Sequence, residues 1–170
     1  MEIALLSANS LRLKGKNTTF VVNPQDKNTS YAAAVVFYST KENLKINPDA
    51  VVIDGAGDYE IGGIKLMASR FENDIIYSFI IDDVSVLLAD LKVVSKNHQK
   101  LKDYDIVAAY ITSDEDPSSA INLASSAVLF FGEKAAESVK KTVKEGLQEM
   151  NKYSVTKDKL TTEVAQILLK

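Results

Sequence analysis

The glycine-rich segment of this chain reads Val52-Ile53-Asp54-Gly55-Ala56-Gly57-Asp58-Tyr59-Glu60-Ile61-Gly62-Gly63-Ile64. It holds four of the chain's seven glycines. Because glycine tolerates positive φ, this spacing predicts a strand that ends near Gly55, a short strand from Gly57, and a second turn at Gly62-Gly63. Backbone amides at Gly55 and Gly57 are also able to bind an anion. We favour the simpler interpretation, in which the glycines set the geometry of the strands.

The composition is that of a globular protein with a sizeable core. The chain has 170 residues, of which 46% are hydrophobic and 25% charged, and we expect one domain over residues 1–170. A net charge of −3 gives no basic surface, so nucleic acid is not an expected partner. The absence of cysteine excludes disulfides and thiolate metal sites. With neither a signal-peptide pattern nor an apolar run of about 20 residues, we expect a cytoplasmic protein without a membrane partner.

The order of the expected elements predicts a mixed α/β (α+β) domain. The first ninety residues read as short strands, and the rest alternates between helix and strand. A hairpin is expected with Asp82-Asp83 at its tip, and Asp116 is expected to cap a helix that begins near Pro117. The expected strands are 2–6, 10–13, 19–22, 33–38, 50–53, 57–61, 65–69, 75–81, 84–89, 106–111, 127–131, 153–156 and 164–169. The expected helices are 97–102, 117–124 and 133–150, the last from its apolar stripe at helical spacing.

Several segments resemble, in the same order, the compact branch of metallo-β-lactamase-like zinc hydrolases and lactonase-like proteins. The segment Gly55-Ala56-Gly57-Asp58-Tyr59-Glu60 is similar to that family's Gly-Pro-Gly-Glu-Tyr-Glu. Its Leu-Gly-His-Ser-Cys-Phe-Arg-Ile-Lys-Gly opening resembles the stretch that here begins Leu6-Ser7-Ala8-Asn9-Ser10. Further similarities are Val21-Val22-Asn23-Pro24, Val86-Leu87-Leu88-Ala89-Asp90-Leu91, Tyr104-Asp105-Ile106-Val107 and the last two strands. The resemblance implies a four-layer αββα sandwich, here in a compact version with some helices trimmed.

The same resemblance implies zinc chemistry, but its ligands are missing. The family's His-x-His-x-Asp-His loop matches Thr40-Lys41-Glu42-Asn43-Leu44-Lys45, so its histidines become Thr40, Glu42 and Lys45. Leucine donates nothing to a metal, and a lysine ammonium repels a cation. The family's later histidines fall near Phe71-Glu72 and Phe131-Gly132-Glu133, and only its bridging aspartate is retained, as Asp90. We therefore expect no metal site and no cofactor, although zinc is what the family would hold.

The retained acidic and basic residues leave several interpretations open. Asp90 is either a relic ligand with a raised pKa or a residue that caps a loop by accepting backbone hydrogen bonds. A Lys45–Asp90 ion pair in place of the metal is a hypothesis. His98 lies in a polar run and is expected to be an exposed residue at a helix start. Asp114-Glu115-Asp116 is expected to cap a helix, with a magnesium or calcium site as the alternative.

Three classes of function follow. The first is a non-catalytic, metal-free descendant of a zinc hydrolase that serves in binding or assembly. The second is a hydrolase with an altered, non-zinc site that uses Glu42, Asp58 or Asp90, with Thr40 and Lys45 nearby. The third is an oligomeric structural module with an exposed strand edge or apolar face. A homo-oligomer or a protein partner fits the first and third classes, and the aromatic residues to check for a binding patch are Tyr31, Tyr38, Phe71 and Phe130.

Overall fold

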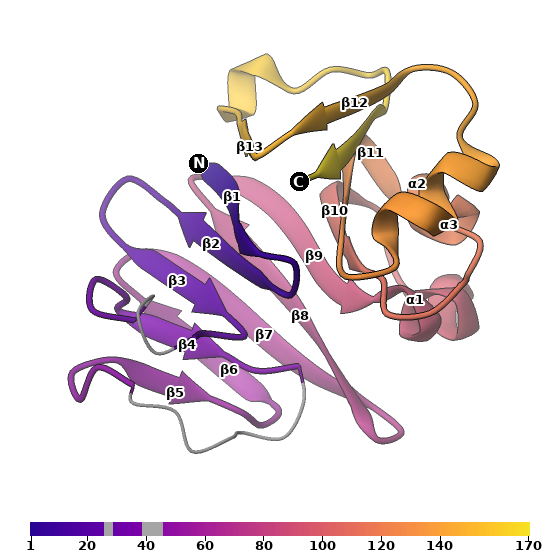
Figure 1. Ribbon diagram of the computed structural model, residues 1–170. Helices are drawn as coiled ribbons and strands as arrows, with labels where there is room; N and C mark the ends of the chain where they lie inside the picture. The colour runs from indigo at the N-terminus through magenta and orange to yellow at the C-terminus, as the bar shows by residue number, and fades with distance from the viewer. Residues whose placement is uncertain (26–28, 39–45) are drawn as a thin grey trace.

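Two β-sheets packed face to face form the centre of the protein, in a computed structural model that describes residues 1–25, 29–38 and 46–170 (Figure 1). The six-stranded sheet has the order β13-β1-β2-β3-β4-β5. Strands β13, β1, β2 and β3 pair antiparallel, and β3, β4 and β5 pair parallel. The strands of this sheet are β1 (Glu2–Ser7), β2 (Ser10–Lys14), β3 (Thr19–Val22), β4 (Ala34–Val36), β5 (Val51–Ile53) and β13 (Lys152–Ser154).

The second sheet has eight strands in the order β12-β14-β11-β10-β9-β8-β7-β6. The first five of these pair parallel, and β9, β8, β7 and β6 pair antiparallel. The sheet therefore has a parallel half and an antiparallel half. Its strands are β6 (Gly57–Ile61), β7 (Ile64–Phe71), β8 (Asp74–Ile81), β9 (Val84–Asp90), β10 (Tyr104–Tyr110), β11 (Ala124–Phe131), β12 (Leu147–Met150) and β14 (Ala165–Leu169).

Two tight turns in the antiparallel half are built as the sequence predicts. Gly62 and Gly63, with φ of 58° and 84°, join β6 to β7. Asp82 and Asp83, with φ of 50° and 67°, join β8 to β9. Two successive residues with positive φ give a hairpin whose twist matches that of the flanking strands, and glycine and aspartate adopt this conformation at low cost.

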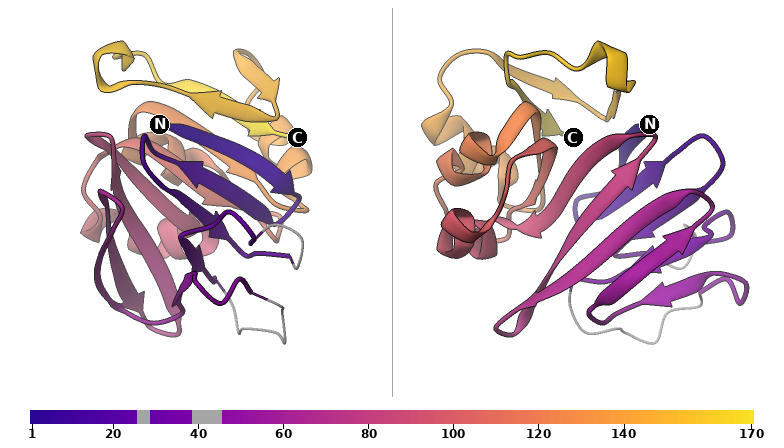
Figure 2. Two further views of the ribbon diagram at one scale, coloured as in Figure 1. Left: turned by 90° about the vertical axis from the view of Figure 1, so that its left-hand side faces the viewer. Right: turned by 180° about the vertical axis from the view of Figure 1, so that it is seen from behind.

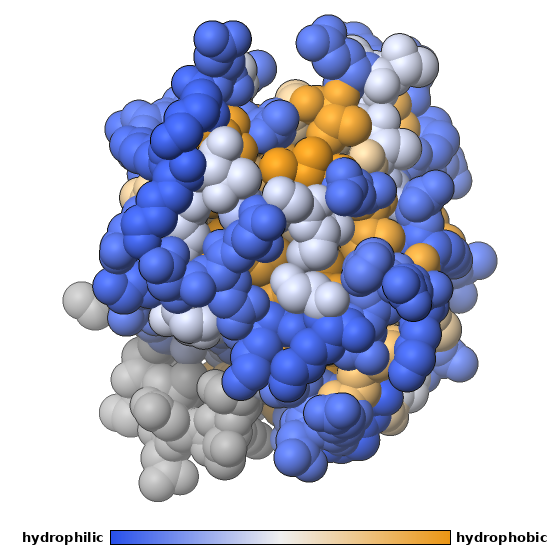
Figure 3. Space-filling model, turned by 90° about the vertical axis from the view of Figure 1, so that its right-hand side faces the viewer, coloured by the Kyte–Doolittle hydropathy of each residue, from blue (hydrophilic) through white to orange (hydrophobic). Residues whose placement is uncertain are grey.

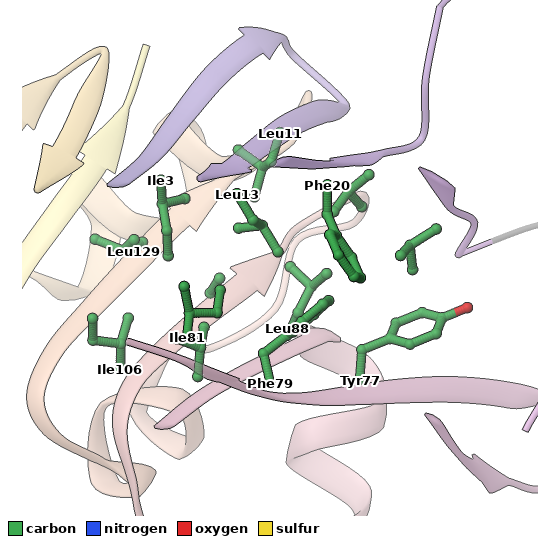
Figure 4. Close-up of a cluster of buried hydrophobic side chains, with 14 of the residues drawn as sticks. Ile3, Leu11, Leu13, Phe20, Tyr77, Phe79, Ile81, Leu88, Ile106 and Leu129 are labelled. Carbon is green, nitrogen blue, oxygen red and sulfur yellow. The ribbon is translucent and has the colours of Figure 1, made fainter. Parts of the chain in front are cut away.

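The main core lies between the two sheets (Figure 4). Phe20 on β3 and Phe79 on β8 are almost fully buried, and their rings meet edge to face with centroids 5.9 Å apart. Alternate residues of each strand point into this layer, as the strand period of two requires. Burying each such side chain contributes about 1.5–3 kcal/mol to folding.

Three helices cover the parallel half of the eight-stranded sheet: α1 (Leu91–Asn97), α2 (Ser118–Leu123) and α3 (Ala135–Thr142). They bury a second apolar cluster against strands β9, β10, β11 and β14. Two short 3-10 helices, η2 (His98–Lys100) and η3 (Lys157–Lys159), complete the described elements. Figure 3 shows that the helix-bearing side is mostly hydrophilic, with hydrophobic residues exposed in its upper and middle parts and a smaller group in its lower part.

The predicted mixed α/β class is confirmed, and the expected trimming of helices is visible. Among the described residues, the outer face of the six-stranded sheet carries only a small apolar cluster that includes Val21, Val35 and Phe37, with no α-helix over it. None of the helices in the described part of the chain is long and apolar enough to cross a membrane.

Two predicted helices differ from the structure. The helix expected over 133–150 ends at Thr142, and Leu147–Met150 forms β12 instead, after a turn at Gly146 with φ of 75°. Pairing with β14 satisfies the backbone hydrogen-bonding groups of Leu147–Met150. The helical spacing of the apolar residues in this segment gave no indication of that pairing. The helix expected over 97–102 begins earlier, because Asp90 caps it at Leu91.

Candidate functional site

The candidate site lies where the ends of strands from both sheets meet. Strand β9 ends at Asp90, β10 at Tyr110 and β11 at Phe131, and because these strands are parallel, their carboxyl ends share one edge. Strand β4 of the other sheet is followed by Phe37 and Tyr38. Tyr38 reaches Tyr110, so the ends of the two sheets converge here.

An aromatic cluster fills this convergence. Tyr38 stacks on Tyr110, with ring centroids 5.1 Å apart and planes 12° from parallel. Phe131 packs against Tyr110 at 5.2 Å and against Tyr38 at 6.4 Å, and Tyr77 meets Tyr38 at 6.0 Å. The Tyr77 hydroxyl donates a hydrogen bond to the carbonyl oxygen of Phe37. These four rings, which we call the aromatic cluster, join both sheets.

The Tyr38 hydroxyl lies at the centre of this arrangement. It is buried and makes no hydrogen bond with any described residue. Burial, followed by the nearby Tyr77 and Asp90, raises the pKa of Tyr38 well above its ordinary value. A ring with a deeply desolvated hydroxyl occupies volume that a substrate or solvent would need.

Asp90 borders the aromatic cluster and caps α1. Its Oδ1 accepts a hydrogen bond from the backbone N–H of Lys92 at 2.9 Å. Partial burial raises the pKa of Asp90, and the hydrogen bond from Lys92 opposes the shift. Asp90 is the register partner of Tyr110 across β9 and β10, and its charge contributes to the raised pKa values of Tyr38 and Tyr110.

Side-chain amides form the rim of the site. Asn23 Oδ1 accepts from the backbone N–H of Tyr38 at 3.0 Å, and Asn23 Nδ2 donates to the carbonyl oxygen of Asn9 at 3.2 Å. Asn9 Nδ2 donates to Glu133 Oε1 at 3.1 Å. Asn23 adopts positive φ, 45°, to make both contacts. These groups link the beginning of the chain to the end of β11 by hydrogen bonds.

Comparison with known proteins adds a direct structural likeness. A protein from Thermotoga maritima, assigned as a zinc-dependent hydrolase of the metallo-β-lactamase superfamily, superposes with a TM-score of 0.71 at 15% identity, over 99% of this chain and all of that one. The chain has the metallo-β-lactamase fold. No protein-family model and no curated protein matches the sequence.

Two further metallo-β-lactamase-fold comparisons give the same fold at a greater distance. A protein assigned as a metal-dependent hydrolase from Parabacteroides distasonis has a TM-score of 0.57 at 14% identity, over 81% of this chain and 86% of that one. A diphosphatase of the PhnP family has a TM-score of 0.53 at 13% identity, over 91% and 85%. Identities at this level establish the shared fold and leave the activity to be argued from the site.

The described residues of this metallo-β-lactamase-fold chain do not fit a zinc ion at the strand ends. Zinc requires three or four imidazole, thiolate or carboxylate ligands around one point. In the described part of the chain, no group of three or more His, Cys, Asp or Glu side chains is placed to hold a metal. Asp90, which the resemblance matches to the family's bridging aspartate, caps a helix through Oδ1 and is the register partner of Tyr110, one of the stacked rings.

Three candidate residues, Thr40, Glu42 and Lys45, lie in 39–45, outside the described residues. The Lys45–Asp90 ion pair therefore stays a hypothesis. Asp58, the other carboxylate considered for catalysis, lies on the edge strand β6 and lines a groove on the outer face of the sheet, to which Asp90 does not contribute.

The remaining candidates have structural roles. His98 is exposed at the start of η2, as predicted, with Nδ1 3.3 Å from the carbonyl oxygen of Ser95. Asp116 was predicted as the N-cap of α2, but the N-cap is Pro117; Asp116 lies one residue earlier and accepts hydrogen bonds from the backbone N–H and the hydroxyl of Ser118. Asp114 instead forms a 2.7 Å ion pair with Lys141.

Sequence reasoning singled out Tyr38 but missed its neighbours in the aromatic cluster. Tyr38 and Phe131 each end a predicted strand, and Tyr110 is the penultimate residue of another. Aromatic residues at the ends of strands that converge are a signal that was present in the sequence. Of the other aromatics proposed for a binding patch, Tyr31 is exposed, Phe71 is partly buried and Phe130 is fully buried in the core.

Proposed function

We propose that this chain is a non-catalytic, metal-free protein of the metallo-β-lactamase fold, kept for binding or assembly. The observation that carries the proposal is the stack of Tyr38 on Tyr110 where the two sheets converge. A hydrolytic site of this fold needs a concave space with converging metal ligands. In the described part of this chain, aromatic rings and amide hydrogen bonds lie around the end of β9 instead, which supports the proposal.

The second support for the proposal is the small number of side chains that are able to bind zinc. The sequence has a single histidine, His98, and it lies exposed on η2, outside the aromatic cluster. Asp90 offers one carboxylate, whose oxygen already accepts a backbone hydrogen bond. A single carboxylate gives a far weaker zinc site than three or four ligands.

Metal content tests the proposal directly. The chain should be purified without added metal and analysed by inductively coupled plasma mass spectrometry against a measured protein concentration. We expect zinc well below one ion per chain, and thermal unfolding unchanged by zinc or by a chelator. One or two zinc ions per chain, with unfolding temperature lowered by the chelator, would overturn the metal-free reading.

The second candidate function is a hydrolase with an altered, non-zinc site around Asp90 and Glu42. One observation favours it: burial raises the pKa of Asp90, which is how proteins prepare a general acid or base. The test is hydrolysis of lactone and phosphodiester substrates by the wild type and by Asp90→Asn, which keeps a capping side chain. Asp58→Asn, in the outer groove, is the matched control, and activity lost only in Asp90→Asn would replace our proposal with this one.

A further inference from the structure

The outer face of the antiparallel half of the eight-stranded sheet has no described helix over it. Viewed from behind the orientation of Figure 1, strands β6, β7 and β8 lie in front, with the helices to one side (Figure 2). A groove of about 490 Å³ runs over this face. We call it the outer groove; its lining includes Asp58, Glu60, Lys65, Met67, Ile80 and Lys102.

The middle of the outer groove is apolar. Met67 on β7 is 44% exposed and Ile80 on β8 is 48% exposed. Because Lys65 pairs with Ile80 and Met67 pairs with Ser78, the two apolar side chains are diagonal neighbours on the same face. An adjoining hollow of about 280 Å³ shares Met67 and extends the apolar surface towards Phe71.

Charges of opposite sign flank this apolar centre. Asp58 and Glu60 project from the edge strand β6, while Lys102 and Lys100 lie on the far side, after η2 and within it. In the described part of the chain, none of these four side chains forms a salt bridge.

Several carboxylates elsewhere in the molecule form salt bridges. Glu2 pairs with Arg12, Asp105 with Lys157 and Glu149 with Lys140. At the outer groove, acids without a salt bridge lie on one flank and lysines without one on the other, and Lys102 lies over the Tyr104 ring, 5.8 Å from its centroid.

We propose that the outer groove is a homodimer interface whose occupant is a second copy of this chain. A two-fold axis parallel to the strands, lying between the two facing sheets at Met67 and Ile80, places the acidic flank of one copy over the lysine flank of the other. The contact between Glu60 of one copy and Lys102 of the other then occurs twice, as an isologous interface requires. Face-to-face packing of two sheets about 10 Å apart buries the apolar centre.

The charge pattern favours a second copy over a small ligand. An amphipathic anion in the groove would pair with Lys65 or Lys102 and leave Asp58 and Glu60 facing its negative charge. A cationic ligand would pair with the acids and leave its positive charge facing the lysines. A second copy presents both signs and satisfies both flanks.

This inference rests on the proposed function, which includes a role in assembly, and it identifies the assembly partner as a second copy of this chain. Its test measures association alone. A failed dimer test would leave the metal content and hydrolysis results unchanged, and a failed metal test would leave the interface standing.

The full chain should be studied by sedimentation equilibrium up to roughly 200 µM, where an interface of micromolar affinity is saturated. We expect a wild-type dimer that dissociates on dilution. Met67→Lys and, separately, Ile80→Lys should weaken the dimer by about tenfold or more, because each buries an unpaired charge twice. Val51→Lys is the matched control: Val51 is 43% exposed on β5 of the other sheet, and its substitution should leave the dimer intact.

A charge exchange tests the two-fold arrangement itself. Glu60→Lys alone and Lys102→Glu alone should each weaken the dimer by about two- to fivefold, and the double variant should regain affinity. Circular dichroism and thermal unfolding verify that each variant is folded. A monomeric wild type, a folded Met67→Lys and Ile80→Lys pair that both still dimerise, or a small molecule retained by the monomer in native mass spectrometry would each overturn the proposal.

Discussion

Tyr38 and Tyr110 stack almost parallel, with ring centroids 5.1 Å apart, although they come from strand ends in different sheets. The contact packs one sheet against the other beside Asp90. It is also the observation on which the proposed metal-free role rests.

The Tyr38–Tyr110 stack should show measurable coupling. In a double-mutant cycle with Tyr38→Leu and Tyr110→Leu, we expect a coupling free energy of about 0.5–1.5 kcal/mol, because paired aromatic rings stabilise beyond the area they bury. Each single variant should itself lower the free energy of unfolding, measured by urea denaturation. Strictly additive single effects would show that the rings do not interact in solution.

Removing the Tyr38 hydroxyl should not destabilise the protein. This oxygen is buried and has no partner among the described residues, so Tyr38→Phe removes a desolvated polar group and keeps the ring. We expect the free energy of unfolding to stay equal or to rise by up to about 1 kcal/mol. If Tyr38→Phe instead lowered the free energy of unfolding by more than about 1 kcal/mol, the hydroxyl would be hydrogen-bonded in solution.

Asp90 should make stability fall as the pH rises. The pKa of Asp90 is raised in the folded state above its unfolded value of about 3.9. At a pH between these two pKa values, the native state binds more protons than the unfolded state. The penalty for the buried charge is absent below this window and complete above it. Asp90→Asn, which still caps α1, should therefore gain stability relative to wild type between pH 4 and pH 7.5.

Asp90→Ala provides the comparison for the cap. It loses the hydrogen bond to the Lys92 backbone and should cost about 1 kcal/mol relative to Asp90→Asn across the pH range. Urea unfolding at several pH values measures both variants. If Asp90→Asn tracked wild type at every pH, the carboxylate would be solvated and the site more open than described.

Gly132 should tolerate no side chain. Its φ is 118°, and a Cβ at this position would lie 2.3 Å from the carbonyl oxygen of Ile111. We expect Gly132→Ala to lower the free energy of unfolding by about 3 kcal/mol or more.

Gly55→Ala is the matched control, because no heavy atom lies within 4 Å of the added Cβ and its φ is not positive. It should be neutral or stabilise by up to about 1 kcal/mol through the unfolded chain. Similar losses in the two variants would mean that the close approach at Gly132 relaxes freely.

Local chemistry explains which parts of the fold were predictable. The turns at Gly62-Gly63 and Asp82-Asp83 were predicted, because glycine and aspartate are residue types that adopt positive φ at low cost. The segment Leu147–Met150 was predicted as helix because its apolar spacing is helical, yet it forms β12. Its pairing partner, β14, lies later in the chain, and no local pattern records that pairing.

In the candidate site, too, some features were predictable from the sequence and others depended on packing. The sequence by itself determined that the histidine ligands of the resembling hydrolases are missing, because a residue type either can or cannot donate to zinc. Only the tertiary structure decided which side chains meet beside Asp90. Tyr38 and Tyr110 are far apart in the chain and meet because the sheets pack face to face, so their stack depends on packing between strands and not on local sequence.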